Sequence, residues 1–312
     1  MTNRTNNIVA LVLMLATSFL SVNAQALSQS PLQVTSGQLQ HLEIYSPEMV
    51  ETIKVDIWTP QGYSPQEKYP VVYMHDGQNL FDASSTWNHQ AWEMDSVACK
   101  LIETGKIPLV IIVGIHSVDS TRLGDLMPEK PLKYLTCDTV KQFIVNSMCR
   151  GKLRADEYLA FIVNTLKPFI DGNFSTDPTM EATSIMGSSM GGLISIYGMA
   201  EYPEVFGSAA CLSTHWSGTI DSNPDFPNAM IRYLGESLPR DNKHYLYMDN
   251  GDCMIDTLYT PHFNRINVIA RDEWGFGDNR LLTRYLPGAS HCERDWAERV
   301  ALPLTFILNK KR

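Results

Sequence analysis

The sequence lacks the features that mark a nucleic-acid-binding or metal-binding protein. Its 25 Lys and Arg are outnumbered by 34 Asp and Glu, which gives a net charge of −9 at pH 7. The longest basic cluster is 310–312, so a positive face for nucleic acid or anionic lipid is not expected. The six cysteines form no C-x-x-C pair and no paired Cys/His motif, so we expect no zinc site and no other cofactor.

Only one long apolar run that could serve as a targeting or membrane segment is present, and it lies at the N-terminus. Arg4 precedes an apolar stretch over 8–20, and the residues 22–24 form a small-residue cleavage site that ends at Ala24. This layout is typical of a secretory signal peptide covering 1–24 and cleaved near Ala24. A membrane anchor is the alternative, but the run is shorter than the roughly 20 residues that cross a bilayer. We therefore expect a secreted or periplasmic protein with no membrane span after signal removal.

The remaining residues, 25–312, are enough for one α/β domain. Residues 52–58 alternate apolar and polar side chains, which is typical of a half-buried strand. Two continuous apolar runs, 69–74 and 107–115, are typical of strands buried on both faces of a parallel sheet. Further strands are predicted at 182–186, 206–212, 244–248 and 280–285, with helical spacing at 158–170, 263–270 and 296–307.

The alternation of strands and helices predicts an α/β fold with a mainly parallel central sheet flanked by helices. The segment 117–154 is less periodic, contains two prolines and two cysteines, and is predicted to be an insertion. Long segments between core elements often form a lid or bind substrate, but a purely structural loop is an equal alternative. The oligomeric state is left open by the sequence.

A nucleophile motif follows the predicted strand at 182–186. Residues 187–191 read Gly-Ser-Ser-Met-Gly, which matches G-x-S-x-G between a strand and a helix. The two glycines remove Cβ atoms that would collide in the tight turn, and the turn exposes the hydroxyl of Ser189. A glycine-rich turn without chemistry is the alternative.

A serine hydroxyl needs a base, and the base in turn needs an acid that orients it. Among eight histidines, His291 alone lies between the last predicted strand and the last helix. The acid should follow the strand at 244–248, where Asp249, Asp252 and Asp256 are available. Asp249 lies too close to the strand, so Asp256 is preferred and Asp252 remains the alternative.

The loop after the apolar run 69–74 reads His-Asp-Gly-Gln-Asn-Leu-Phe-Asp. The backbone N–H of Gln78 in this loop and that of Met190 are predicted to form an oxyanion hole. Gly77 lets the backbone approach a substrate, and His75 is expected to hold the loop by hydrogen bonding. Trp87, Trp92 and Trp216 are candidates for lining the cleft, although burial in the core is an equal alternative.

With these motifs the sequence resembles the "Putative esterase" family of the α/β-hydrolase fold. That family includes feruloyl and acetyl-xylan esterases (carbohydrate esterase family 1), enterochelin-type siderophore esterases and mycolyltransferases. The likeness covers about 45–310 and rests on YPVVYMHDGQNLFD, LKPFID, GSSMGG, the run to STHW and HCERDW. The resemblance implies that Ser189 and His291 are catalytic and that Gln78 and Met190 are oxyanion donors.

The chain departs from this family around the acid. Relatives often read Gly-Thr-Glu and then Leu-Asp after the strand, and the position that matches the downstream aspartate is Asp256. Relatives also have His-Asn-Glu where this chain has His-Cys-Glu, so Cys253 and Cys292 fall on the two loops that carry acid and base. A disulfide between Cys253 and Cys292 is our hypothesis, with two free thiols as the alternative. Cys137 and Cys149 are a candidate second pair.

The resemblance favours a secreted serine esterase that acts through an acyl-enzyme and deacylates a carbohydrate-linked feruloyl or acetyl ester. The expected partner is a small-molecule or glycan ester. Hydrolysis of a siderophore lactone and acyl transfer are alternatives within the same chemistry. A catalytically inactive hydrolase fold that binds glycans is the alternative of another class, and it should have lost a member of the Ser–His–Asp set.

Overall fold

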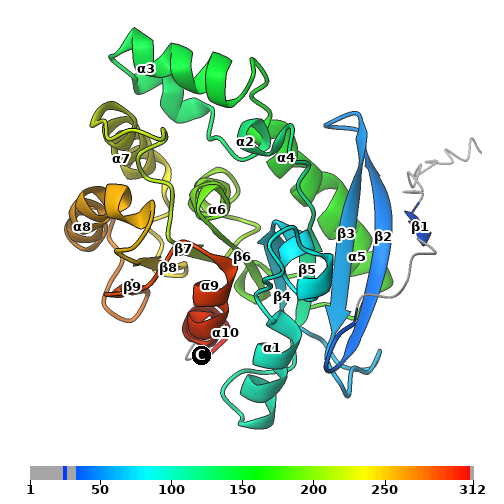
Figure 1. Cartoon of the computed structure of the whole chain (residues 1–312). Coiled ribbons are helices and arrows are strands. Elements are labelled where there is room, and N and C mark those ends of the chain that lie inside the picture. The colour runs from blue at the N-terminus through cyan, green and yellow to red at the C-terminus, as the bar shows by residue number, and fades with distance from the viewer. Residues whose placement is uncertain (1–23, 27–32, 310–312) are drawn as a thin grey trace, which may run out of the picture.

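The computed structural model describes residues 24–26 and 33–309. Residues 1–23 of the expected signal peptide lie outside them. Figure 1 shows a twisted sheet with helices on both faces. The strands are β1 (Ala24–Ala26), β2 (Gln38–Ser46), β3 (Glu51–Thr59), β4 (Val71–His75), β5 (Ile111–Ile115), β6 (Thr183–Ser188), β7 (Ser208–Leu212), β8 (Tyr245–Asn250) and β9 (Leu281–Tyr285). The helices are α1 (Met94–Glu103), α2 (Arg122–Asp125), α3 (Asp138–Gln142), α4 (Ala155–Phe161), α5 (Lys167–Asn173), α6 (Met190–Glu201), α7 (Asp225–Ser237), α8 (Asp256–Asp272), α9 (Glu293–Arg299) and α10 (Ala301–Leu308).

The sheet has the order β1-β2-β3-β5-β4-β6-β7-β8-β9. From β5 to β9 all neighbours are parallel, whereas β1, β2, β3 and β5 pair antiparallel. The sheet is mainly parallel, as the alternating pattern predicts, and the fold is the α/β-hydrolase fold that the family resemblance implies. Because the central strands are parallel, their carboxyl ends meet at one edge of the sheet, which is where sites form in such folds.

Both faces of the central strands are buried, which explains their continuous apolar sequences. In β4, Val71 and Tyr73 belong to one core with α4 to α8, while Val72 and Met74 belong to a second core with α1 and α10. The helices in Figure 1 accordingly lie in two layers, with α1, α9 and α10 on one side of the sheet. Two well-packed cores fix the strand ends to which the site loops are attached.

The segment 117–154 adds helices but no strand to the sheet. It forms α2 and α3 together with a turn of 3-10 helix over Lys130–Tyr134. Helix α2 packs against α4, and the 3-10 turn packs against α7. The segment therefore passes across the helical layer on the α6 side of the sheet (Figure 1). Among the residues that the structure describes, no helix combines the length and apolarity needed to cross a membrane.

The two expected disulfides are wrong, because all six cysteines are free thiols. Each thiol of the proposed pairs instead contacts a polar group close to it in the fold. The Cys253 Sγ lies 3.6 Å from Asp252 Oδ1, and the Cys292 Sγ lies 3.3 Å from Asp295 Oδ1. Likewise, Cys137 contacts Thr139, and the buried Cys149 contacts the carbonyl of Leu123.

Candidate active site

Ser189 occupies the turn between β6 and α6. Its backbone has φ 57° and ψ −120°, a region that residues other than glycine rarely adopt. Two hydrogen bonds hold this conformation: the Ser189 N–H donates to Leu212 O (2.9 Å) and the His215 N–H donates to Ser189 O (3.2 Å). A Cβ on Gly187 would lie 2.8 Å from the carbonyl carbon of Gly191, so the turn closes only with glycine there.

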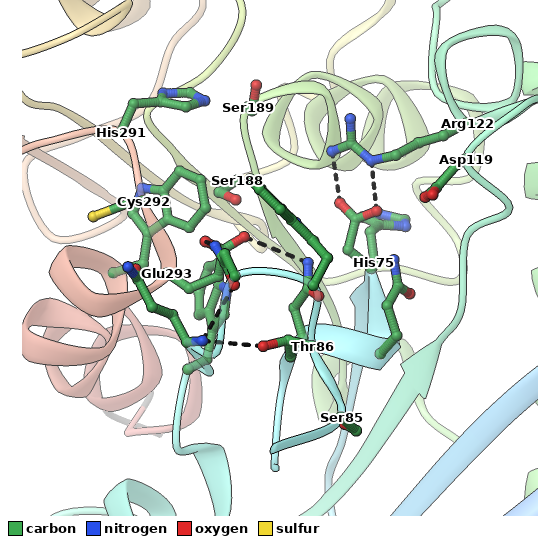
Figure 2. Close-up of a pocket in the computed structure, with 18 of the residues that line it drawn as sticks. His75, Ser85, Thr86, Asp119, Arg122, Ser188, Ser189, His291, Cys292 and Glu293 are labelled. Carbon is green, nitrogen blue, oxygen red and sulfur yellow. Dashed lines mark hydrogen bonds and ion pairs between the residues drawn. The ribbon is translucent and has the colours of Figure 1, made fainter. Parts of the chain in front are cut away.

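Asp256 and His291 are brought together from separate loops. Asp256 begins α8 and is fully buried, and its Oδ1 lies 2.6 Å from His291 Nδ1. His291 lies between β9 and α9, and it lines the same pocket as Ser189. In Figure 2 the imidazole of His291 extends towards Ser189. The arrangement has the chain order nucleophile, acid, histidine that the sequence suggests.

The second oxygen of Asp256 is held by two donors. The Ser213 hydroxyl donates to Oδ2 at 2.6 Å, and the Gly251 N–H donates to it at 3.0 Å. Ser213 itself accepts from the Arg299 Nη2 at 2.6 Å. The carboxylate of Asp256 therefore cannot rotate, and Oδ1 stays directed at His291.

The other two candidate acids have different partners. Asp252 accepts from the Gly288 N–H (2.7 Å) and from the Tyr285 hydroxyl (3.1 Å), so it braces the loop that leads to His291. Asp249 is buried in an ion pair with Arg299, 3.2 Å away. The structure thus places Asp256, and neither alternative, against the histidine.

Aromatic rings enclose His291 on two sides. Its ring packs edge-on against Trp296 at 5.0 Å between centroids and against Tyr259 at 5.8 Å. Tyr259 lies one helical turn after Asp256, and its hydroxyl contacts His215. Burial, repulsion by His291 and the charge of Arg122 lower the pKa of His215 to about 3, so His215 is neutral at pH 7.

The loop after β4 is held close to the nucleophile turn. Asp76 has φ 56° and ψ 47°, and Gly77–Asn79 forms a short 3-10 helix. A Cβ on Gly77 would lie 2.5 Å from the backbone of Gly114 in β5, so the loop packs directly on the sheet. Gln78 lines the pocket with Ser189, and Met190 is the first residue of α6. Both backbone N–H groups therefore belong to segments that border Ser189.

His75 supports this loop from the interior. Its Nδ1 lies 2.7 Å from the Tyr158 hydroxyl, in line with the expected role of hydrogen bonding. Burial lowers the pKa of His75 to about 4, with the charges of Asp76 and Arg122 acting in opposite directions. His75 is thus a neutral side chain at pH 7 and has no base-orienting carboxylate partner of the kind that His291 has.

A pocket of about 670 Å³ opens in front of Ser189 (Figure 2). Most of the residues that line it have polar side chains, and the carboxylate of Glu293 accepts from the Asn88 side chain at 2.7 Å. Trp87 at the pocket is 85% exposed, and Trp92 also lines it. Trp216 is fully buried in the core and does not line the pocket, whereas Trp92 lines the pocket and is also part of the buried core.

Three supporting side chains have roles that the sequence does not predict. Ser213, Arg122 and Trp296 touch the acid, the loop after β4 and the histidine, respectively. Trp296 shares the motif HCERDW with His291, whereas Ser213 and Arg122 lie far along the chain from the residues that they hold. The serine, histidine and aspartate were recognisable because each follows a strand at the same edge of the sheet.

The family model described as "Putative esterase" matches residues 46–273. The chain belongs to this esterase family. The strand order and the helices on both faces of the sheet agree with this membership (Figure 1).

Similarity to individual proteins is weaker. The esterase is 24% identical over 186 residues to an "Endo-1,4-beta-xylanase/feruloyl esterase" of Xylanibacter ruminicola, covering 58% of this chain and 22% of that protein. The chain spans between 22% and 60% of the length of three curated relatives that it matches.

Two solved structures share the fold. A ferulic acid esterase superposes with a TM-score of 0.61 at 15% identity, covering 88% of this chain and 99% of that chain. The enterobactin esterase of Shigella flexneri superposes with a TM-score of 0.62 at 16% identity, covering 90% of this chain and 64% of that chain. At these identities the likeness establishes the fold of the chain, and the substrate has to be inferred from the residues that line the pocket.

Proposed function

We propose that the protein hydrolyses esters through an acyl-enzyme formed on Ser189. In this proposal His291 removes the hydroxyl proton while Ser189 Oγ attacks the ester carbonyl, and the proton passes to the leaving alcohol. Water, activated by His291, then releases the acid. The observation that carries the proposal is the 2.6 Å contact of His291 Nδ1 with the buried Asp256, in a pocket that Ser189 also lines.

The backbone N–H groups of Gln78 and Met190 are the proposed oxyanion donors. Met190 stands at the N-terminus of α6, where backbone N–H groups lack intrahelical partners and the helix dipole favours negative charge. Gln78 borders the same pocket from the loop after β4. Removing one such donor typically costs about 2.7–4 kcal/mol of transition-state stabilisation.

We propose a carbohydrate-linked acetyl or feruloyl ester as the substrate class. Asn88 and Glu293 offer hydrogen-bond donors and acceptors suited to sugar hydroxyls, and the exposed Trp87 offers an apolar face on which a sugar ring can lie. Asp119 and Glu293 also give the pocket negative charge. A neutral sugar ester suits these carboxylates better than an anionic catecholate siderophore does.

We also propose that the esterase is exported. The support is the charged, apolar and small-residue order of 1–24, which is typical of a secretory signal peptide. Sequencing the N-terminus of protein recovered from the producing cells tests this, because export with cleavage predicts a chain that begins at Gln25.

Hydrolysis of p-nitrophenyl acetate tests the chemistry. The wild type should turn over this ester, while Ser189→Ala and His291→Ala should lose at least about 10³-fold in kcat. His89→Ala is a matched control, since His89 lies outside the pocket at Ser189, and it should keep wild-type activity. A folded wild type without turnover would favour the inactive glycan-binding alternative.

A substrate panel tests the specificity. Acetylated xylan and methyl ferulate should be cleaved with higher kcat/KM than a catecholate trilactone, because the pocket carries carboxylates on its walls. Preference for the trilactone would overturn the carbohydrate proposal and leave the serine mechanism intact.

A further inference from the structure

A largely buried ion pair between Arg122 and Asp76 lies beside the proposed oxyanion donor and has no part in the mechanism proposed above. Arg122 donates to Asp76 through two nitrogens, with Nε 2.6 Å from Oδ1 and Nη2 2.7 Å from Oδ2. Asp76 is 9% exposed and directly precedes Gly77 and Gln78. A paired fork of this kind fixes both the position and the plane of the carboxylate.

A second set of hydrogen bonds joins the same segment to Gln78. The Ser117 hydroxyl donates to Asp76 Oδ1 at 2.6 Å and accepts from Gln78 Nε2 at 2.8 Å. The Ser117 N–H donates to Gln78 Oε1 at 3.1 Å. The side chains on either side of Gly77 are therefore both held by the segment 117–122.

The loop needs such support because its backbone is unusual. Asp76 is a non-glycine residue in the left-handed region, and its carbonyl accepts from the Asn79 N–H at 2.9 Å to close the turn. Residues in this region persist only when their surroundings enforce the conformation. Arg122 also lines the pocket, and Figure 2 shows its guanidinium directed from its own backbone into the pocket.

We propose that Arg122 is a positioning residue that, through Asp76 and with Ser117, holds the loop 76–79 so that the Gln78 N–H faces the reacting carbonyl. The inference rests on the proposed function, because it gives Arg122 a purpose only if Gln78 donates to the oxyanion. The segment 117–122 then contributes to catalysis without touching the bond that breaks. Because an oxyanion exists in the transition state and not in the bound ester, loss of Arg122 should lower kcat and leave KM nearly unchanged.

Arg122→Met tests the inference, and Arg154→Met is its matched control. Arg154 belongs to the same region of the chain and forms ion pairs with Asp125 (2.7 Å) and Glu51 (3.0 Å), away from the pocket. On p-nitrophenyl acetate, Arg122→Met should lose about 10- to 100-fold in kcat, less than the full loss of a donor. Arg122→Lys, which keeps the charge without the fork, should fall between this variant and the wild type.

Arg154→Met should keep kcat within about threefold of the wild type, even if this variant unfolds at a lower urea concentration. A rise in KM with unchanged kcat in Arg122→Met would overturn the inference, because it would make Arg122 a ground-state binding residue. An equal loss of kcat in both variants would also overturn it, because general destabilisation of the fold would then explain both losses.

Hydrogen exchange provides a readout that does not depend on activity. In Arg122→Met the amide of Asn79, which closes the turn at Asp76, should exchange about tenfold faster than in the wild type. In Arg154→Met it should not change. Unchanged exchange at Asn79 in Arg122→Met would overturn the inference. An inert wild type with the expected exchange would overturn the proposed function and with it the catalytic purpose of Arg122, while the support that Arg122 gives to the loop 76–79 would stand.

Discussion

Replacing Asp256 with asparagine tests how the buried carboxylate sets the protonation of His291. The oxygen Oδ2 receives hydrogen bonds from the Ser213 hydroxyl and the Gly251 N–H, so an asparagine must keep its carbonyl oxygen there. Its NH₂ group then faces His291 Nδ1, which at present donates to the carboxylate 2.6 Å away. Two donors cannot share one hydrogen bond, so His291 must carry its proton on Nε2.

The proton on Nε2 blocks the reaction at its first step. In this tautomer the nitrogen that faces the pocket is a donor, and it cannot accept the Ser189 proton. The equivalent change in a serine protease lowers kcat about 10⁴-fold with its geometry intact. We expect a loss of about 10³- to 10⁴-fold in kcat for Asp256→Asn, which corresponds to about 4–5.5 kcal/mol.

The assay is steady-state hydrolysis of p-nitrophenyl acetate at pH 7, with Asp252→Asn as the matched variant. Asp252 accepts hydrogen bonds from Tyr285 and Gly288 at the edge of the same loop, so its variant should stay within about threefold of the wild type. The reasoning would be refuted if Asp256→Asn kept activity within tenfold. It would also be refuted if the two variants lost activity equally.

Three further predictions concern binding, stability and pH. Trp87→Ala should raise KM for a sugar ester about 3- to 10-fold and leave KM for p-nitrophenyl acetate unchanged, since Trp87 is exposed and can stack on a sugar ring. An unchanged KM for the sugar ester, or an equal rise in KM for both esters, would contradict the stacking role. Ser213→Ala should lower the urea unfolding free energy by about 1–3 kcal/mol, because it removes one hydrogen-bond partner from Arg299 and one from the buried Asp256 carboxylate; unchanged stability would contradict this. His215→Asn should flatten the pH dependence of that free energy by about 2 kcal/mol between pH 7 and pH 5. The unfolded histidine binds a proton over this range, and the buried one, with a pKa of about 3, does not; an equally steep profile would count against a neutral His215.

The central strands and the serine turn could be predicted from the sequence because their signals are local. The apolar runs at 69–74 and 107–115 are buried on both faces, as β4 and β5 show from 71 and 111 onward. Strand β2 gives no such signal, because its side chains are mostly exposed or half-buried and only Ile44 and Ser46 are buried. Helix α8 begins at Asp256 rather than near 263, so the acid lies at a helix start.

The supporting contacts could not be predicted because they join segments far apart in the chain. Arg122 meets Asp76 46 residues away, and Ser213 meets Asp256 43 residues away. The sequence also does not show where a thiol points. Cys253 and Cys292 lie on adjoining loops, yet each sulfur contacts a carboxylate and the two do not form a disulfide. Sequence spacing places such residues near one edge of the sheet but says nothing about where each side chain points.

The most direct test of the account is mass spectrometry of the protein after reaction with a fluorophosphonate. Ser188 and Ser189 are neighbours, and both line the pocket, so the site of modification distinguishes the serine in the strained nucleophile turn from the ordinary serine beside it. We predict one adduct in the wild type and in Ser188→Ala, on the hydroxyl of Ser189, and none in Ser189→Ala. A folded wild type without an adduct, or an adduct that persists in Ser189→Ala, would contradict the proposal that Ser189 is the nucleophile.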